Sequence, residues 1–290
     1  MAVKKINAPK RSEQMSTDKN NSTRINQPIG IFDSGVGGLT VASAIAKALP
    51  NEQIIYFGDT AHLPYGDKSA DSIKYYSIRI AQFLLEQNCK IIVIACNTAS
   101  ALAYETVKDF VGNKVTVIDV VNPIVNEIVQ NKKLKHIGVI ATKGTIKSDI
   151  YAKKIKHLSK NVEVASLATP LLASMIEEGF FNNKISRTVI HDYLSRPKLK
   201  KIDSLILACT HYPLIKKEIE EFYKGKVKIY DNAEAVAKTV AEVLTKEKLL
   251  ATKKNNKHKF YISDYTKSFE ETSKNFFKSK IKPTQAAIWK

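Results

Sequence analysis

Two of the three cysteines in the chain follow similar runs of apolar residues. Cys96 lies in the segment Ile91–Thr98 (IIVIACNT), and Cys209 lies in the segment Ser204–His211 (SLILACTH). Apolar runs of this kind are typical of strands buried on both faces of a parallel sheet. Small polar residues follow each sulfur, where a strand passes into a helix. The repetition predicts that the two cysteines occupy matching positions in two matching halves of the fold.

A pair of cysteines in such positions can carry out acid and base chemistry. A helix N-terminus next to a cysteine stabilises the thiolate and lowers the pKa of the thiol. Two thiols that face one cleft can remove a proton from one face of a small molecule and return a proton to the other face. These steps invert a stereocentre, which is the reaction of a racemase or epimerase. No cofactor is expected, because hydrogen bonds and the exclusion of water can stabilise the carbanion.

Two further polar side chains could assist these thiols. Asp33 ends an apolar run and begins a turn with three glycines, ahead of a helix predicted at 39–48. The backbone N–H groups of such a turn are open to an anion. Asp33 could orient one cysteine or accept a proton near it, and His211 could serve Cys209. Cys89 precedes a predicted strand instead of following one, and we interpret it as a packing residue.

Neutral hydrogen-bond donors accompany the predicted strand ends. They suit the binding of carboxylates without a fixed arginine, and a small dicarboxylate matches them. No Cys-x-x-Cys pair or His-rich cluster indicates a metal site, so none is expected. The donors are Ser34, Tyr65, Asn97, Thr98, Thr142, Thr145 and Thr210.

The order of the predicted elements indicates an α/β fold. Strands and helices alternate along the chain, which is typical of parallel sheets with helices on both faces. We expect two pseudo-symmetric doubly wound lobes with mainly parallel sheets and the active site in the cleft between them. The loop at 60–66 is predicted to be irregular because it is rich in turn residues. The predicted strands are 28–32, 54–59, 91–94, 115–121, 137–141, 162–167, 204–208, 226–230 and 260–263, and the predicted helices are 39–48, 72–87, 99–110, 122–129, 148–158, 171–180, 186–194, 231–244 and 269–277.

The composition limits the class of protein. The 290 residues include 46 Lys and Arg against 28 Asp and Glu, which gives a net charge of +18. Most of this charge is lysine without interleaved aromatic residues, which favours a solvated surface over a nucleic-acid interface. The N-terminus lacks a secretory apolar segment, and no apolar run is long enough to span a membrane. We therefore expect a cytoplasmic protein with free thiols, no membrane contact and a disordered polar leader at 1–27.

Four motifs together resemble the glutamate racemase family, within the cofactor-independent aspartate/glutamate racemase superfamily. They are Asp33–Val41 (DSGVGGLTV), Pro64–Gly66 (PYG), Ala95–Ala99 (ACNTA) and Ala208–Leu214 (ACTHYPL), and they occur in the order of that family. The resemblance covers about residues 28–277. It implies an isomerase that interconverts L- and D-glutamate and supplies D-glutamate for bacterial peptidoglycan, and hence for cell wall and cell shape.

The same resemblance implies roles for individual residues. Cys96 and Cys209 would be the acid/base thiols, and Asp33, His211 and Glu177 would be their polar assistants. Family members are often homodimers, and their last segment returns to the first lobe. The implied domains are a leader at 1–27, a first lobe at 28–122 and 231–290, and a second lobe at 123–230. The implied substrate contacts are Asp33, Ser34, Pro64, Tyr65, Gly66, Asn97, Thr98, Thr145, Thr210 and His211.

Three alternatives stay open at this point. An aspartate racemase would use the same pair of thiols, although the Thr-His-Tyr-Pro sequence after Cys209 favours glutamate. A binding module would hold an acidic ligand between the lobes without exchanging its α-proton, and both cysteines would then be packing residues. The lysine-rich leader and tail could contact nucleic acid, with an affinity that falls steeply as salt rises.

Overall fold

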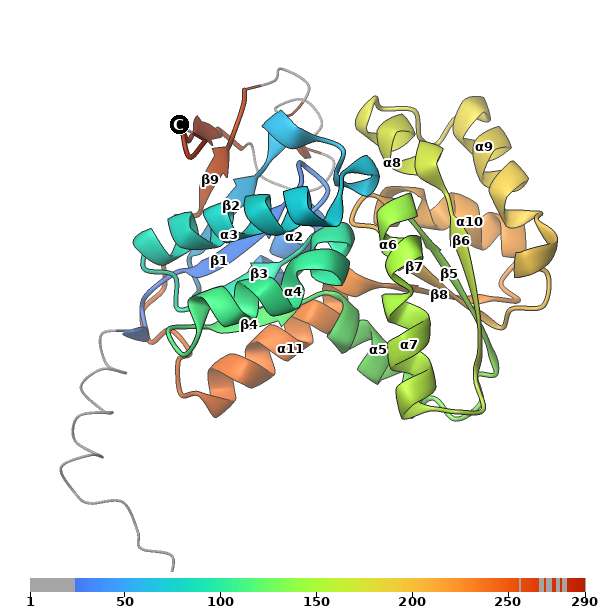
Figure 1. Cartoon of the computed structure of the whole chain (residues 1–290), viewed down its shortest axis with the longest axis horizontal. Coiled ribbons are helices and arrows are strands. Elements are labelled where there is room, and N and C mark those ends of the chain that lie inside the picture. Colours follow the sequence, from blue (N-terminus) through green and yellow to red (C-terminus); the bar gives the residue numbers. More distant parts are fainter. Residues whose placement is uncertain are drawn as a thin grey trace, which may run out of the picture.

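Two parallel sheets form the centres of two lobes (Figure 1). The structure, a computed structural model, describes residues 24–255, 257–265, 269, 273–274, 277 and 281–289. Residues 1–23 of the predicted leader and most of the helix predicted at 269–277 lie outside the described residues. The first sheet is six-stranded, in the order β10-β9-β2-β1-β3-β4, and the second is four-stranded, in the order β6-β5-β7-β8. Adjacent strands run parallel in both sheets, which confirms the predicted fold class.

The elements follow one another in the alternating order that the sequence predicts. The strands of the first sheet are β1 Ile29–Asp33, β2 Ile54–Gly58, β3 Ile91–Ile94, β4 Thr116–Asp119, β9 Lys259–Ile262 and β10 Thr284–Gln285, and those of the second are β5 His136–Ala141, β6 Glu163–Ala168, β7 Ser204–Ala208 and β8 Lys228–Asp231. The α-helices are α2 Leu39–Ala48, α3 Ala70–Glu86, α4 Asn97–Val111, α5 Val121–Gln130, α6 Lys143–Ser148, α7 Ile150–Leu158, α8 Pro170–Glu177, α9 Lys184–Leu194, α10 Lys216–Tyr223 and α11 Asn232–Lys246.

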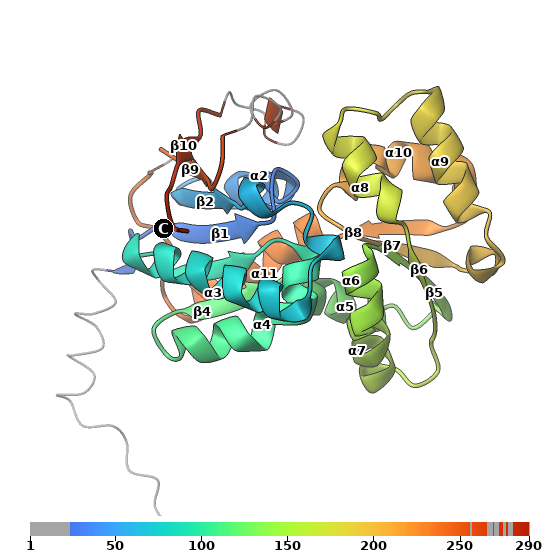
Figure 2. The same ribbon diagram turned by 45° about the horizontal axis from the view of Figure 1, so that its top comes forward.

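Helices cover both faces of the first sheet (Figure 2). Successive side chains of a strand point to opposite faces, so each strand contributes to two cores. Ile29 and Ile31 of β1 belong to the core with α2 and α11, whereas Phe32 belongs to the core with α3 and α4. β1, β2 and β3 are buried along their whole length, and their sequences are apolar apart from glycines and the buried Asp33 at the end of β1.

The second sheet is built on the same plan. Leu205 and Leu207 of β7 lie in the core that α8, α9 and α10 cover, whereas Ile206 and Ala208 lie in the core with α5 and α7. Within the described part of the chain, no helix has both the length and the apolar character needed to cross a bilayer.

The structure differs from the predicted elements at several places, and it contains two helices, α6 and α10, that the sequence analysis did not predict. The helix predicted at 148–158 is interrupted, because Asp149 adopts a left-handed conformation with φ of 56° and separates α6 from α7. The loop predicted to be irregular contains two short 3₁₀ helices, Thr60–His62 and Tyr65–Asp67. The short strand β10 pairs with β9 and was not predicted.

Two ends of the described chain lie against the first lobe. Arg24, from the predicted leader, donates a hydrogen bond to the carbonyl oxygen of Lys90 at 3.2 Å, and the Lys90 side chain donates to the carbonyl oxygen of Ile25 at 2.7 Å. β9 and β10 belong to the first sheet, although they follow the second lobe in sequence. The domain boundaries themselves stay predictions.

Candidate active site

A small cavity lies where the carboxyl ends of the two sheets meet. Its volume is about 30 Å³, which is room for about two water molecules. Most of the predicted site residues line it, but Asp33 and Thr145 lie behind its wall. The lining residues are Ser34, Leu63, Pro64, Tyr65, Gly66, Cys96, Asn97, Thr98, Thr142, Ala173, Glu177, Cys209, Thr210 and His211.

Cys96 is the N-cap residue of α4, and its side chain is buried. Its Sγ accepts a hydrogen bond from the Ala99 N–H at 3.4 Å and donates one to the Ser34 hydroxyl at 3.8 Å. Burial raises the pKa of Cys96 to about 12, and the nearby Asp33 carboxylate adds to this effect. The lowered pKa expected from the sequence is therefore wrong for Cys96, because burial outweighs the helix N-terminus.

Cys209 directly follows β7 and faces the same cavity. The segment after it is a 3₁₀ helix, Tyr212–Ile215, so the expected α-helix N-terminus is absent at this sulfur. A side chain takes its place, since His211 Nδ1 lies 3.6 Å from Cys209 Sγ. The other ring nitrogen, Nε2, lies 2.8 Å from Glu177 Oε1 at the end of α8. The structure thus brings Cys209, His211 and Glu177 into one chain of contacts.

The buried imidazole of His211 carries a proton more tightly than an ordinary histidine. Burial alone lowers the pKa of His211, but its hydrogen bonds to Cys209 and Glu177 outweigh burial and hold the pKa well above its usual value. His211 Nδ1 therefore lies within hydrogen-bonding distance of the Cys209 sulfur, in surroundings that favour the protonated imidazole.

Asp33 lies at the end of β1, fully buried between the two halves of the site. Its carboxylate accepts hydrogen bonds from the Thr210 hydroxyl at 3.3 Å and from the Gly35 N–H at 3.1 Å. Burial raises the pKa of Asp33, and the positive charge of His211 partly opposes this shift. Asp33 thus joins the glycine turn of the first lobe to the residue that follows Cys209.

Comparison with known proteins identifies the family. The model for Asp/Glu/Hydantoin racemase matches residues 35–240. The chain belongs to this family. It is 42% identical over 254 residues to the glutamate racemase of Geobacter metallireducens, covering 87% of this chain and 93% of that protein. This membership confirms the predicted amino-acid racemase.

Solved structures of racemases from this family have the same fold. The glutamate racemase of Francisella tularensis, in complex with D-glutamate, superposes with a TM-score of 0.86 at 40% identity, over 91% of this chain and 99% of that chain. A glutamate racemase isoform of Bacillus anthracis superposes with a TM-score of 0.83 at 34% identity, over 90% and 97% of the two chains.

Threonine hydroxyls join the two lobes of the racemase beside the cavity. Thr98 Oγ1, in α4, lies 2.9 Å from Thr142 Oγ1 and 3.3 Å from Thr145 Oγ1 of the second lobe. Thr142 is also the N-cap residue of α6. Thr145 therefore supports the lining residue Thr98 and does not reach the cavity itself.

Two residues that the sequence analysis missed position Asn97. Its Oδ1 accepts hydrogen bonds from the Tyr151 hydroxyl at 2.6 Å and from Asn232 Nδ2 at 2.7 Å. Asn232 follows β8 directly, so its place at a strand end was a usable signal. Tyr151 lies inside α7 and carried no such signal. Among the described residues, no cluster of three or more His, Cys, Asp and Glu side chains could hold a metal ion.

Proposed function

We propose that this racemase interconverts L- and D-glutamate without a cofactor, and that Cys96 and Cys209 are its acid and base. One observation carries the proposal: the two cysteines come from different lobes, yet both line the same small cavity. The similarity to proteins named glutamate racemase over most of the chain supports glutamate as the substrate.

The proposed reaction transfers protons on opposite faces of the α-carbon. The thiolate of one cysteine takes the α-proton, so the C–H bond breaks, an S–H bond forms and the electron pair stays on the substrate. The thiol of the other cysteine then gives its proton to the opposite face and becomes the thiolate. The two cysteines have exchanged their protonation states after one turnover, which is the general acid and base chemistry expected of two matched thiols.

We assign Cys209 as the base and Cys96 as the acid in the resting enzyme. The raised pKa of Cys96 favours its neutral thiol. The protonated imidazole of His211 lies beside Cys209 and places a positive charge next to its sulfur. Glu177 holds that imidazole from the other side.

The remaining lining residues suit a dicarboxylate. The hydroxyls of Ser34 and Thr98, the Asn97 amide and the Gly66 N–H are neutral hydrogen-bond donors. Because the cavity holds only about two water molecules, we propose that glutamate enters after the lobes or the loop at 59–66 move apart.

The test is proton NMR of L-glutamate in D₂O with the purified protein and no added cofactor. We expect the α-proton to exchange while D-glutamate appears, and we expect Cys96→Ser and Cys209→Ser to abolish racemisation. Cys89→Ala is the matched control, because Cys89 is buried away from the cavity and should leave the rate unchanged.

Other outcomes distinguish the alternatives. Exchange with L-aspartate but not with L-glutamate would make the chain an aspartate racemase. Ligand-dependent thermal stabilisation without any exchange would favour a binding module. Full activity in Cys96→Ser or Cys209→Ser would overturn the two-thiol mechanism.

From the family resemblance we also propose a cytoplasmic homodimer that supplies D-glutamate for peptidoglycan. Light scattering on the purified protein tests the dimer. Loss of the gene in its host, with and without added D-glutamate, tests the role in the cell wall.

A further inference from the structure

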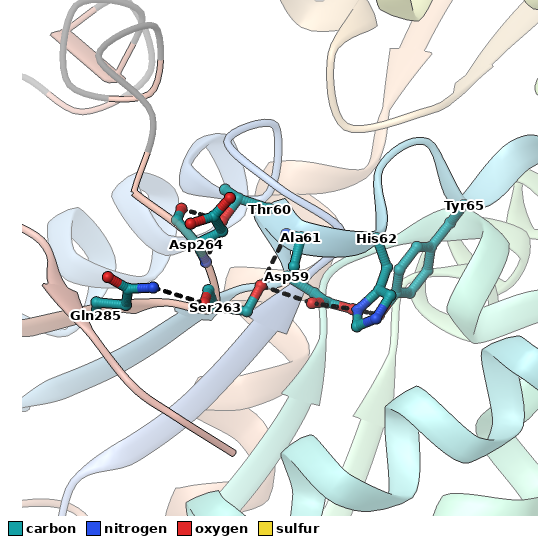
Figure 3. A network of polar contacts seen from close by, with 8 residues as sticks. All are labelled: Asp59, Thr60, Ala61, His62, Tyr65, Ser263, Asp264 and Gln285. Carbon is teal, nitrogen blue, oxygen red and sulfur yellow. Dashed lines mark hydrogen bonds and ion pairs between the residues drawn. The ribbon is translucent and has the colours of Figure 1, made fainter. Parts of the chain in front are cut away.

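Polar contacts join the loop at 59–66 to the segment that follows β9 (Figure 3). The loop residues Pro64, Tyr65 and Gly66 line the cavity, whereas Asp59 at the start of the loop is fully buried and does not line it. The Asp59 carboxylate accepts a hydrogen bond from the Tyr65 hydroxyl at 2.6 Å, and it lies 2.9 Å from His62 Nδ1. Asp59 therefore holds the loop at 59–66 in place through its contacts with Tyr65 and His62.

The end of the chain supplies a further partner of Asp59. The Ser263 hydroxyl, just after β9, donates to Asp59 Oδ1 at 2.7 Å and accepts from the Ala61 N–H at 2.8 Å. The next residue contributes too, because the Asp264 N–H donates to the Thr60 hydroxyl at 2.9 Å. Ser263 and Asp264 thus form hydrogen bonds with three consecutive loop residues, Asp59, Thr60 and Ala61.

Aromatic packing fixes the same loop from a second direction. The His62 ring stacks on Tyr76 of α3, with ring centroids 4.0 Å apart, and the Trp289 ring meets it edge-on at 4.6 Å. Trp289 also contacts Tyr76, with centroids 5.5 Å apart. The segment that carries Trp289 is held to β9, since the Ala286 N–H donates to the Ile262 carbonyl oxygen at 2.9 Å.

We propose that Ser263 and Trp289 are positioning residues for the substrate: acting through Asp59 and His62, they hold Tyr65 against the cavity. Neither residue lines the cavity. Without the Ser263 hydroxyl, the buried Asp59 carboxylate keeps only its contacts with Tyr65 and His62, so the loop relaxes and the cavity loses its shape. The end of the chain therefore sets the affinity for substrate. This inference rests on the proposed racemase function.

The kinetic test compares Ser263→Ala and Trp289→Ala with the wild type. For each we expect KM for glutamate to rise about tenfold while kcat changes far less, because the thiols and their partners are untouched. Ser263→Thr keeps the hydroxyl and Trp289→Phe keeps a ring, so each should recover most of the affinity. Thr284→Ala, exposed on the adjoining strand β10, is the matched control. If Ser263→Ala fails to fold, the comparison of Trp289→Ala with Trp289→Phe provides the same test.

A second measurement does not depend on turnover. Trp289 is the single tryptophan of the chain, so its fluorescence reports on the contact with His62. We expect acrylamide to quench it about twice as strongly in Ser263→Ala as in the wild type, since local opening exposes packed rings, and to quench Thr284→Ala like the wild type.

The outcomes separate this inference from the proposed function. A wild-type protein without racemase activity would overturn the proposed function, while the quenching comparison would still decide whether Ser263 and Trp289 hold one network. Unchanged KM in both alanine variants, or unchanged quenching in Ser263→Ala, would overturn the inference in an active racemase.

Discussion

At the scale of single residues, burial acts differently on the two halves of the site. Burial and the Asp33 carboxylate raise the pKa of Cys96 to about 12. Beside Cys209 lies His211, whose contacts with Cys209 and Glu177 hold its pKa well above the usual value despite burial. One sulfur therefore lies in a site that favours the neutral thiol, and the other lies beside a cation.

Replacing Glu177 should make the stability of the protein less dependent on this cation. The folded protein binds the His211 proton more tightly than the unfolded chain does. That interaction therefore stabilises the fold fully below about pH 6.5 and is lost as the pH rises through the raised folded pKa. We expect Glu177→Gln to lower the free energy of unfolding by about 2 kcal/mol near pH 6 and by much less near pH 10. Urea unfolding at both pH values measures the difference.

The matched control is the neighbouring carboxylate. Glu178 is exposed at the end of α8, so Glu178→Gln should change the free energy of unfolding by less than about 0.5 kcal/mol at either pH. An equal loss for Glu177→Gln at both pH values would mean that Glu177 does not act through the proton of His211.

Sequence reasoning reached the two cysteines and His211 but could not separate their environments. A strand followed by Cys and small polar residues is a local pattern, and it predicted the positions of Cys96 and Cys209. The pKa of each buried group depends on neighbours far away in the sequence, such as Asp33 for Cys96. A local sequence pattern therefore predicts which residues lie together in the site, but it does not predict their pKa values in the folded protein.

At the scale of elements, the turn between β1 and α2 packs directly against the segment after β7. A Cβ atom on Gly37 would lie 2.6 Å from Thr210 Oγ1 and 2.6 Å from His211 Cε1. Such a contact forces a displacement, so Gly37→Ala should shift the residues beside Cys209. We expect kcat/KM to fall about 100-fold, because small displacements of catalytic groups have effects of this size. Circular dichroism should keep the native spectrum.

A substitution on the same element provides the control. Lys47 lies on α2 and is exposed, so Lys47→Ala should keep wild-type kcat/KM. Wild-type kcat/KM in Gly37→Ala would show that the contact between the turn and His211 has no role in the reaction.

Most of the buried strands and longer helices were predictable, but the amphipathic helix α10 was missed, and elements defined by pairing or by single dihedral angles were not predictable. The buried strands β1, β2 and β3 consist mainly of apolar residues and were found from the sequence. The break between α6 and α7 depends on the left-handed conformation of Asp149. Aspartate tolerates this conformation, but its presence in a sequence does not predict it. β10 is exposed and two residues long, so it exists only through its pairing with β9.

At the scale of the whole molecule, the fold class was predictable because alternation of strands and helices leaves few topologies. The contacts that close the fold were not predictable, since they join segments far apart in sequence. Lys90, just before β3, is the clearest case. Its fully buried ammonium lies 2.5 Å from Glu52 and donates hydrogen bonds to the carbonyl oxygens of Ile25 and Leu249, each at 2.7 Å. One side chain thus ties the start of the described chain and the segment after α11 to the first lobe.

Removing the charge of Glu52 should therefore destabilise the whole protein. Glu52→Gln leaves the Lys90 ammonium buried without a counter-charge, and we expect the free energy of unfolding to fall by about 3 kcal/mol in urea unfolding. The exposed pair of Lys74 and Asp71 is the control, and Asp71→Asn should cost less than about 0.5 kcal/mol. Adding Lys90→Met to Glu52→Gln should recover part of the loss, because the double variant buries no charge. If Glu52→Gln lowers the free energy of unfolding no more than Asp71→Asn does, the ion pair does not stabilise the fold. Apolar contacts would then hold the start of the described chain and the segment after α11 to the first lobe.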